Sequence, residues 1–141
     1  MKPLNQVLWT ALIGLMAFHI LMAQPRKVTL PRVAEAKVPL YPRLARAASV
    51  QGKVRVKVTT DGHRVLTTTV ENGAPLLAVA AEENLRTWQF ASHEPISFIV
   101  TYTYKLSGNW KEQSDNPTVT MRLPTEVKVS TQFLPLMTEA H

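Results

Sequence analysis

A strict alternation of apolar and polar residues marks the first predicted hairpin. Residues 53–60, KVRVKVTT, carry valine at every second position as far as residue 58, which is the period of a strand with one buried face. The Asp61-Gly62 pair that follows is a strong turn signal. The valine- and threonine-rich residues 63–71 are therefore predicted to pair back on the first strand.

The clearest strand comes later in the chain. Residues 96–106, ISFIVTYTYKL, place the larger apolar side chains on one face. The opposite face carries Ser97, Ile99, Thr101, Thr103 and Lys105. Residues 107–132 are predicted to form a loop and an extra C-terminal β-hairpin, with strands at 118–123 and 126–131, before a frayed tail at 133–141.

Two stretches have the character of short helices. Residues 42–48, PRLARAA, are rich in helix formers and begin with a proline, which suits the first helical position. Residues 75–88 also begin with proline, and their apolar residues recur at spacings of three and four. The order of elements predicts an α+β domain over residues 37–106, with two helices packed on one face of a three-stranded antiparallel sheet.

The first 23 residues differ from the rest. The stretch from Val7 to Ala23, VLWTALIGLMAFHILMA, contains no Asp, Glu, Lys or Arg, which predicts an N-terminal hydrophobic helix in contact with a membrane. Its length fits both a cleaved signal peptide and an uncleaved membrane anchor. In either case the remainder is expected to be exported, either periplasmic or anchored to the inner membrane and facing the periplasm, after a linker of residues 24–36.

The net charge of +6 is concentrated in one part of the chain, because residues 25–64 hold ten Lys or Arg and only two acids. Such a cluster first suggests nucleic-acid binding, but an exported protein does not usually meet nucleic acid, so no such partner is expected. The alternative hypothesis is a basic envelope scaffold that binds anionic lipid, lipopolysaccharide or cell-wall polymer. The candidate basic surface comprises Arg43, Arg46, Lys53, Arg55 and Lys57.

The sequence contains no recognisable catalytic constellation. It has no cysteine, which excludes disulfides, thiol nucleophiles and cysteine-ligated zinc. The four histidines lack the spacing of metal ligands, so no metal, no cofactor and no enzymatic activity are expected. An acid–base pair between His63 and His93 across the fold would be the basis of a third hypothesis, a small envelope enzyme.

Four short motifs follow one another in the order and spacing of a known family. They are VPLYPRLAR at 38–46, QGKVRV at 51–56, the Asp61-Gly62 turn, and LRTWQF at 85–90. Together they resemble the C-terminal domain of TonB-type energy transducers, over about residues 36–106. The resemblance implies a periplasmic module to which an extended segment of an outer-membrane transporter, the TonB box, adds as a strand.

The resemblance also assigns places on this chain. It puts the acceptor edge on the third strand, from Ser97 to Lys105, and it puts the family's YP motif, here Tyr41 and Pro42, near the docked peptide. It implies inner-membrane motor proteins as further partners if the chain is anchored, and exposed sheet edges also allow a homodimer. Three features depart from the family. The spacer is short, and the family's intramembrane Ser/His pattern is not matched, because His19 lies near the far end of the apolar segment. The extra hairpin would also cap the acceptor edge if it paired with the third strand.

Overall fold

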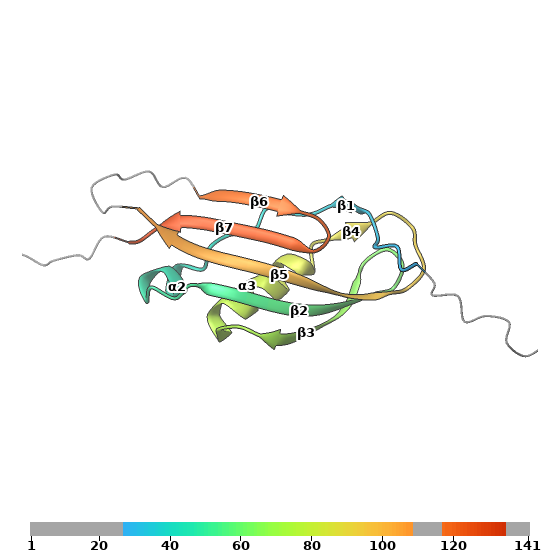
Figure 1. Cartoon of the computed structure of the whole chain (residues 1–141), viewed down its shortest axis with the longest axis horizontal. Helices are drawn as coiled ribbons and strands as arrows, with labels where there is room; N and C mark the ends of the chain where they lie inside the picture. Colours follow the sequence, from blue (N-terminus) through green and yellow to red (C-terminus); the bar gives the residue numbers. More distant parts are fainter. Residues whose placement is uncertain (1–26, 109–116, 135–141) are drawn as a thin grey trace, which may run out of the picture.

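The main sheet has five strands in the order β3-β2-β5-β7-β6 (Figure 1). The computed structural model describes residues 27–108 and 117–134, so the predicted membrane segment from Val7 to Ala23 lies outside the described residues. The main strands are β2 (Gly52–Thr60), β3 (Val65–Asn72), β5 (Ser97–Ser107), β6 (Thr118–Arg122) and β7 (Glu126–Gln132). A second sheet pairs β1 (Val33–Glu35) with β4 (Gln89–Phe90).

The predicted α+β domain with a three-stranded sheet is wrong. Strand is the predominant secondary structure among the described residues, and the two helices, α2 (Arg43–Ala47) and α3 (Pro75–Leu85), are short. The expected hairpin of β2 and β3 is confirmed, as is its antiparallel neighbour β5. However, β7 pairs in parallel with β5 over residues 101–107, and this adds the C-terminal hairpin to the sheet. A period of two shows which face of a strand is buried, but it does not show which strand lies beside it.

The second half of the predicted linker of residues 24–36 is folded into the domain. Val33–Glu35 form β1, and the N–H of Ala91 donates to the carbonyl oxygen of Arg32 at 2.9 Å. The side chain of Pro31 is buried. The chain is therefore part of the domain from Pro31 onward, and a free linker can include only the few residues before it.

The hydrophobic core lies between the main sheet and α3, which crosses behind the strands in Figure 1. Alternate residues of β2, β5 and β7 point toward the helix and are buried: Val54, Val56, Val58, Val100, Tyr102, Tyr104, Val127 and Val129. Helix α2 joins the same layer, because Ala45 belongs to this core and α2 contacts α3. Since Val127 and Val129 are fully buried, the C-terminal hairpin is as much a part of the core as the predicted strands.

A buried polar network connects α3 to the sheet and to the N-terminal segment. The Oδ1 of Asn84 accepts hydrogen bonds from Trp88 Nε1 at 3.1 Å and from the Tyr102 hydroxyl at 2.8 Å. Its Nδ2 donates to the carbonyl oxygen of Lys37 at 2.8 Å. Burial, with a smaller contribution from the neighbouring Tyr104, raises the pKa of Tyr102 well above its ordinary value, so its hydroxyl stays protonated and able to donate.

The turn between β2 and β3 has the chemistry that its sequence predicts. The Asp61 carboxylate accepts hydrogen bonds from the backbone N–H groups of Arg64 and His63, at 2.8 and 2.9 Å, and these bonds hold the pKa of Asp61 below its ordinary value. Gly62 has a φ of 105°, and a Cβ at this position would lie 2.8 Å from the carbonyl oxygen of His93. The residue must therefore be glycine for both conformational and steric reasons.

Candidate functional site

The predicted acceptor edge on β5 is largely occupied by the protein's own hairpin. One side of β5 pairs with β2 over residues 97–104, and the other pairs with β7 over residues 101–107. The N–H of Thr101 donates to the carbonyl oxygen of Thr125, in the turn between β6 and β7, at 2.8 Å. This corrects the sequence assignment: Thr101, Thr103 and Lys105 offer no free edge, and only Ser97 and Ile99 lie beyond the cover of β7.

The structure gives Tyr41 and Pro42 contacts inside the domain. The Tyr41 hydroxyl donates to the carbonyl oxygen of Val50 at 2.6 Å, and its ring packs edge-on against Tyr104 with centroids 5.4 Å apart. Burial raises the pKa of Tyr41 above its ordinary value. Pro42 is the N-terminal cap residue of α2. These contacts assign the motif to the junction of α2 and β2, because the polar atom that a ligand would use is already bonded.

The β5 side chains predicted as part of a peptide site and the β2 side chains predicted as part of a basic site lie on one surface. Lys53, Arg55 and Lys57 alternate with the buried valines of β2, so they point away from α3. In the strand register they stand beside Thr103, Thr101 and Ile99 respectively. Ser97 and Lys105 extend the same row along β5. We call this surface, on the side of the main sheet opposite α3, the open face.

The C-terminal hairpin widens the open face and adds charges to it. Lys128 stands beside Thr103, and Arg122 stands beside Glu126. A hollow of about 230 Å³ lies between Thr120 and these three charged side chains. With β3 included, the open face carries six cations and two carboxylates: Lys53, Arg55, Lys57, Lys105, Arg122, Lys128, Glu71 and Glu126. The polar positions of residues 118–131 already alternate in the sequence, but their place beside Lys53 depends on the parallel pairing.

Arg43 and Arg46 do not belong to this surface. Both come from α2, which packs with α3 in the helical layer. The Arg46 Nε donates to the carbonyl oxygen of Gln132 at 2.6 Å, which connects α2 to the end of β7. The basic surface predicted from the sequence is therefore divided, and Arg46 has an internal structural contact.

The outer edge of β3 is open along its middle. The Thr60 N–H donates to the carbonyl oxygen of Ile96, on the β5 side of β2. Because the backbone groups of successive residues in a strand point to opposite sides, those of Lys57 and Thr59 point toward β3. The backbone groups of their register partners, Thr69 and Thr67, point toward β2. The backbone N–H and C=O groups of Thr68 and Val70 therefore point outward, and no described strand pairs with them there.

A groove of about 380 Å³ runs between this edge and helix α3. It is lined by Val65, Leu66, Thr67, Thr68, Glu82 and Arg86. The Thr68 hydroxyl donates to the Glu82 carboxylate across its floor, and Leu66 is 64% exposed beside it. The edge and the groove together present backbone hydrogen-bonding groups, an apolar side chain and one charge of each sign.

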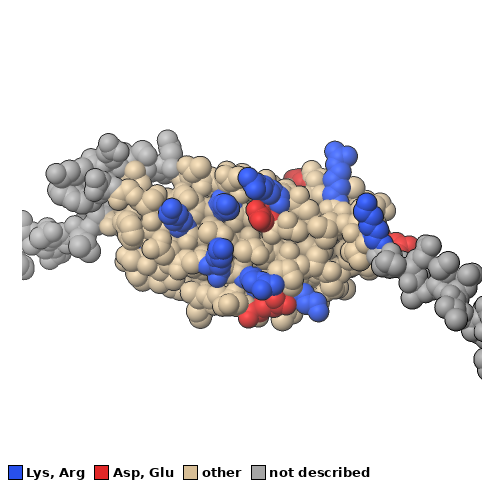
Figure 2. Space-filling view, viewed as in Figure 1, with Lys and Arg blue, Asp and Glu red and all other residues tan. Residues whose placement is uncertain are grey.

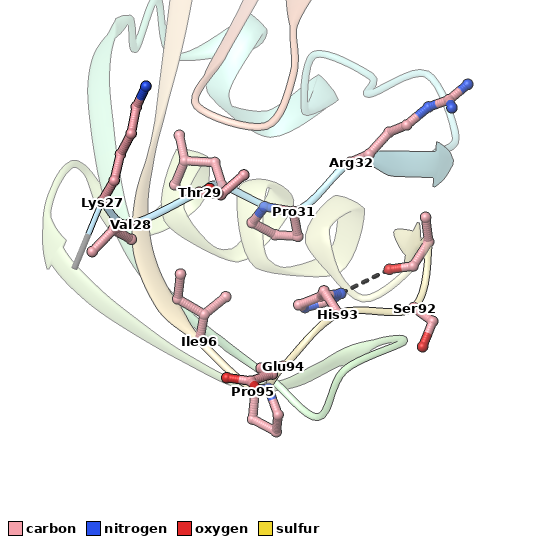
Figure 3. A pocket seen from close by; sticks show the side chains of 12 residues that line it. Lys27, Val28, Thr29, Pro31, Arg32, Ser92, His93, Glu94, Pro95 and Ile96 are labelled. Atoms are coloured by element: carbon pink, nitrogen blue, oxygen red, sulfur yellow. Dashed lines mark hydrogen bonds between the residues drawn. The ribbon is translucent and has the colours of Figure 1, made fainter.

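A larger hollow, with a volume of about 540 Å³, lies between residues 27–32 and 91–96 (Figure 3). His93 lies in this hollow, but both of its ring nitrogens are bonded: Nδ1 donates to the carbonyl oxygen of Ala91 at 2.8 Å, and Nε2 lies 2.7 Å from the Thr60 hydroxyl. The ring is thus held by its own loop and by β2. The structure does not bring His63 and His93 together as an acid–base pair through any described hydrogen bond.

Comparison with known proteins adds no assignment: neither the scan against protein-family models nor the search of curated proteins found a match. Within residues 27–108 and 117–134, no helix has the length and apolarity needed to cross a bilayer. The same residues contain no cluster of three or more His, Asp or Glu side chains arranged to hold a metal ion.

Proposed function

We propose that this domain is a binding module of the cell envelope, of the TonB C-terminal type, that takes up an extended segment of another protein by strand addition at the outer edge of β3. The motifs at 38–46, 51–56 and 85–90 support the family type. The observation that carries the proposal is that the backbone N–H and C=O groups of Thr68 and Val70 point outward beside the groove against α3. Backbone groups at such an edge supply affinity, and the groove selects side chains.

The composition of β3 favours its edge as the acceptor over the edge of β6, at the other side of the main sheet. Natural sheets protect free edges with charges or proline, and residues 65–70 contain neither. The edge strand β6, by contrast, ends at Arg122 and is followed by Pro124. The β2–β3 register shifts near Leu66 and Glu71, so regular pairing is confined to the residues between them. We therefore expect a short partner segment, which is the kind of ligand that a TonB box represents.

The proposed partner is a TonB-box-like peptide of an envelope protein, bound without enzymatic chemistry. Force transmission across the periplasm by inner-membrane motor proteins is not part of the proposal. The domain begins at Pro31, so residues 24–30 extend at most about 25 Å. A module tethered so closely acts near the membrane that carries it.

Replacing Thr68 by proline is expected to weaken peptide binding about tenfold or more, because it removes an outward N–H and places a ring where the peptide backbone would pair. Folding should persist, since the lost N–H does not face β2. The measurement is a titration of the full chain in nanodiscs with a TonB-box peptide, followed by backbone amide NMR shifts along residues 66–70.

The matched control is Thr68→Val, which loses the same hydroxyl bond to Glu82 but keeps the backbone N–H. Its affinity should stay within about twofold of the unchanged chain. Shifts confined to residues 118–122, or no shifts at millimolar peptide, would show that β3 is not the acceptor.

A further inference from the structure

Among the described residues, the open face carries more cations than carboxylates, six against two. Figure 2 looks onto this face and shows Lys and Arg spread across it, with few Asp or Glu. The only ion pair among its described side chains joins Arg55 to Glu71 at 3.7 Å. Lys53, Lys57 and Lys128 are exposed and have no carboxylate within ion-pair distance in the described residues.

These cations form a two-dimensional array. Lys53, Arg55 and Lys57 follow one another along β2 at intervals of about 7 Å, the spacing of alternate residues in a strand. Lys128 lies two strands away from Lys53, with Thr103 between them, which is a separation of about 10 Å. A linear polyanion can follow only one row of such an array, whereas a plane of anions can contact all rows together.

The chain itself brings such a plane close to the domain. The predicted membrane segment ends at Ala23, and the domain begins at Pro31. The seven residues between them, 24–30, extend at most about 25 Å. Lys27 lines the 540 Å³ hollow together with Ile96, which directly precedes β5. A domain held this closely at one end of its sheet can lie with the open face against the bilayer.

We propose that the open face rests on the anionic phosphate headgroups of the membrane that carries the chain's own apolar segment. Its side chains between the cations are mostly Thr and Ser, and Ile99 is its only large apolar member. The contact is therefore electrostatic and peripheral, and it weakens as salt shortens the screening length from about 8 Å at physiological ionic strength. It leaves the β3 edge and its groove free for a partner.

The test uses the full chain in nanodiscs and measures amine labelling of individual lysines by mass spectrometry. In discs with about 30% phosphatidylglycerol, labelling of Lys53, Lys57 and Lys128 should be slower by about threefold or more than in discs of phosphatidylcholine alone. The protection should disappear at about 0.5 M salt. Lys37, whose backbone bonds to the helical layer, serves as the internal reference and should label equally in both.

Charge-neutralising variants distinguish a contact through the open face from an attraction of the whole basic domain to the anionic membrane. The pair Lys57→Gln and Lys128→Gln should remove the protection of Lys53 and Lys105, whereas the matched pair Arg43→Gln and Arg86→Gln, both away from the open face, should leave it intact. Equal labelling in both kinds of disc, equal loss in both double variants, or protection by soluble polyphosphate but not by anionic discs would overturn the proposal. None of these results affects peptide binding at β3, which is measured separately in phosphatidylcholine discs.

Discussion

Replacing Asn84 by alanine is expected to lower the free energy of unfolding by about 3–5 kcal/mol, because it leaves two buried polar groups and one partly buried carbonyl without partners at once. The Trp88 Nε1–H and the Tyr102 hydroxyl lose their acceptor, and the Lys37 carbonyl loses its donor. Asn84 is 7% exposed, so water reaches these groups poorly. The effect should appear in urea unfolding of the full chain in nanodiscs, followed by circular dichroism.

Two tyrosine-to-phenylalanine variants are the controls for this network. Tyr104 is as deeply buried as Tyr102, but its hydroxyl has no hydrogen-bond partner in the described structure. Tyr104→Phe should therefore be neutral or stabilising by up to about 1 kcal/mol, whereas Tyr102→Phe should cost about 1–2 kcal/mol. If both variants had the same effect, the Asn84 network would not be the source of the stability assigned to it.

The second large effect is expected from shortening the two buried valines of β7. The double variant Val127→Ala and Val129→Ala should cost about 4–6 kcal/mol, because each change opens a cavity in the hydrophobic core. The loss should be global, since both side chains lie in the same core as Tyr102. Hydrogen exchange of the full chain would show faster opening of β2 and β5 together with β7.

Lys128→Ala is the matched control, because Lys128 lies between the two valines and points to the open face. It should change stability by no more than about 0.5 kcal/mol. The opposite result would be that, in the double variant of Val127 and Val129, β2, β5 and α3 stay protected from hydrogen exchange and only the β6–β7 hairpin opens. The hairpin would then be a detachable cover of the β5 edge, and a peptide could dock where the family resemblance places it.

The sequence predicts individual elements well where the local pattern is strong. The Asp61-Gly62 turn, the alternation of residues 53–60 and the stripe of Leu77, Ala81 and Leu85 all lie in the elements expected of them. The predicted helix of residues 75–88 is too long, because α3 ends at Leu85 and Trp88 lies after it, although its side chain is buried in the same core. The acceptor edge could not be predicted, because it depends on whether another strand lies beside Thr101 and Lys105. Asn84 was also missed, since a polar residue on a helix gives no sign that it lies beneath Tyr102.

The sequence by itself determined which side chains of each strand face the core and which face outward, because that choice depends only on the alternation of neighbouring residues. It thus placed Lys53, Arg55 and Lys57 on an outward face. Only the tertiary structure decided that β7 closes one side of β5, that Lys128 joins the same surface, and that the β3 edge stays open. The physical reason is that hydrogen bonds between strands join backbone groups, which every residue carries, so strand neighbours are chosen by packing of the whole core.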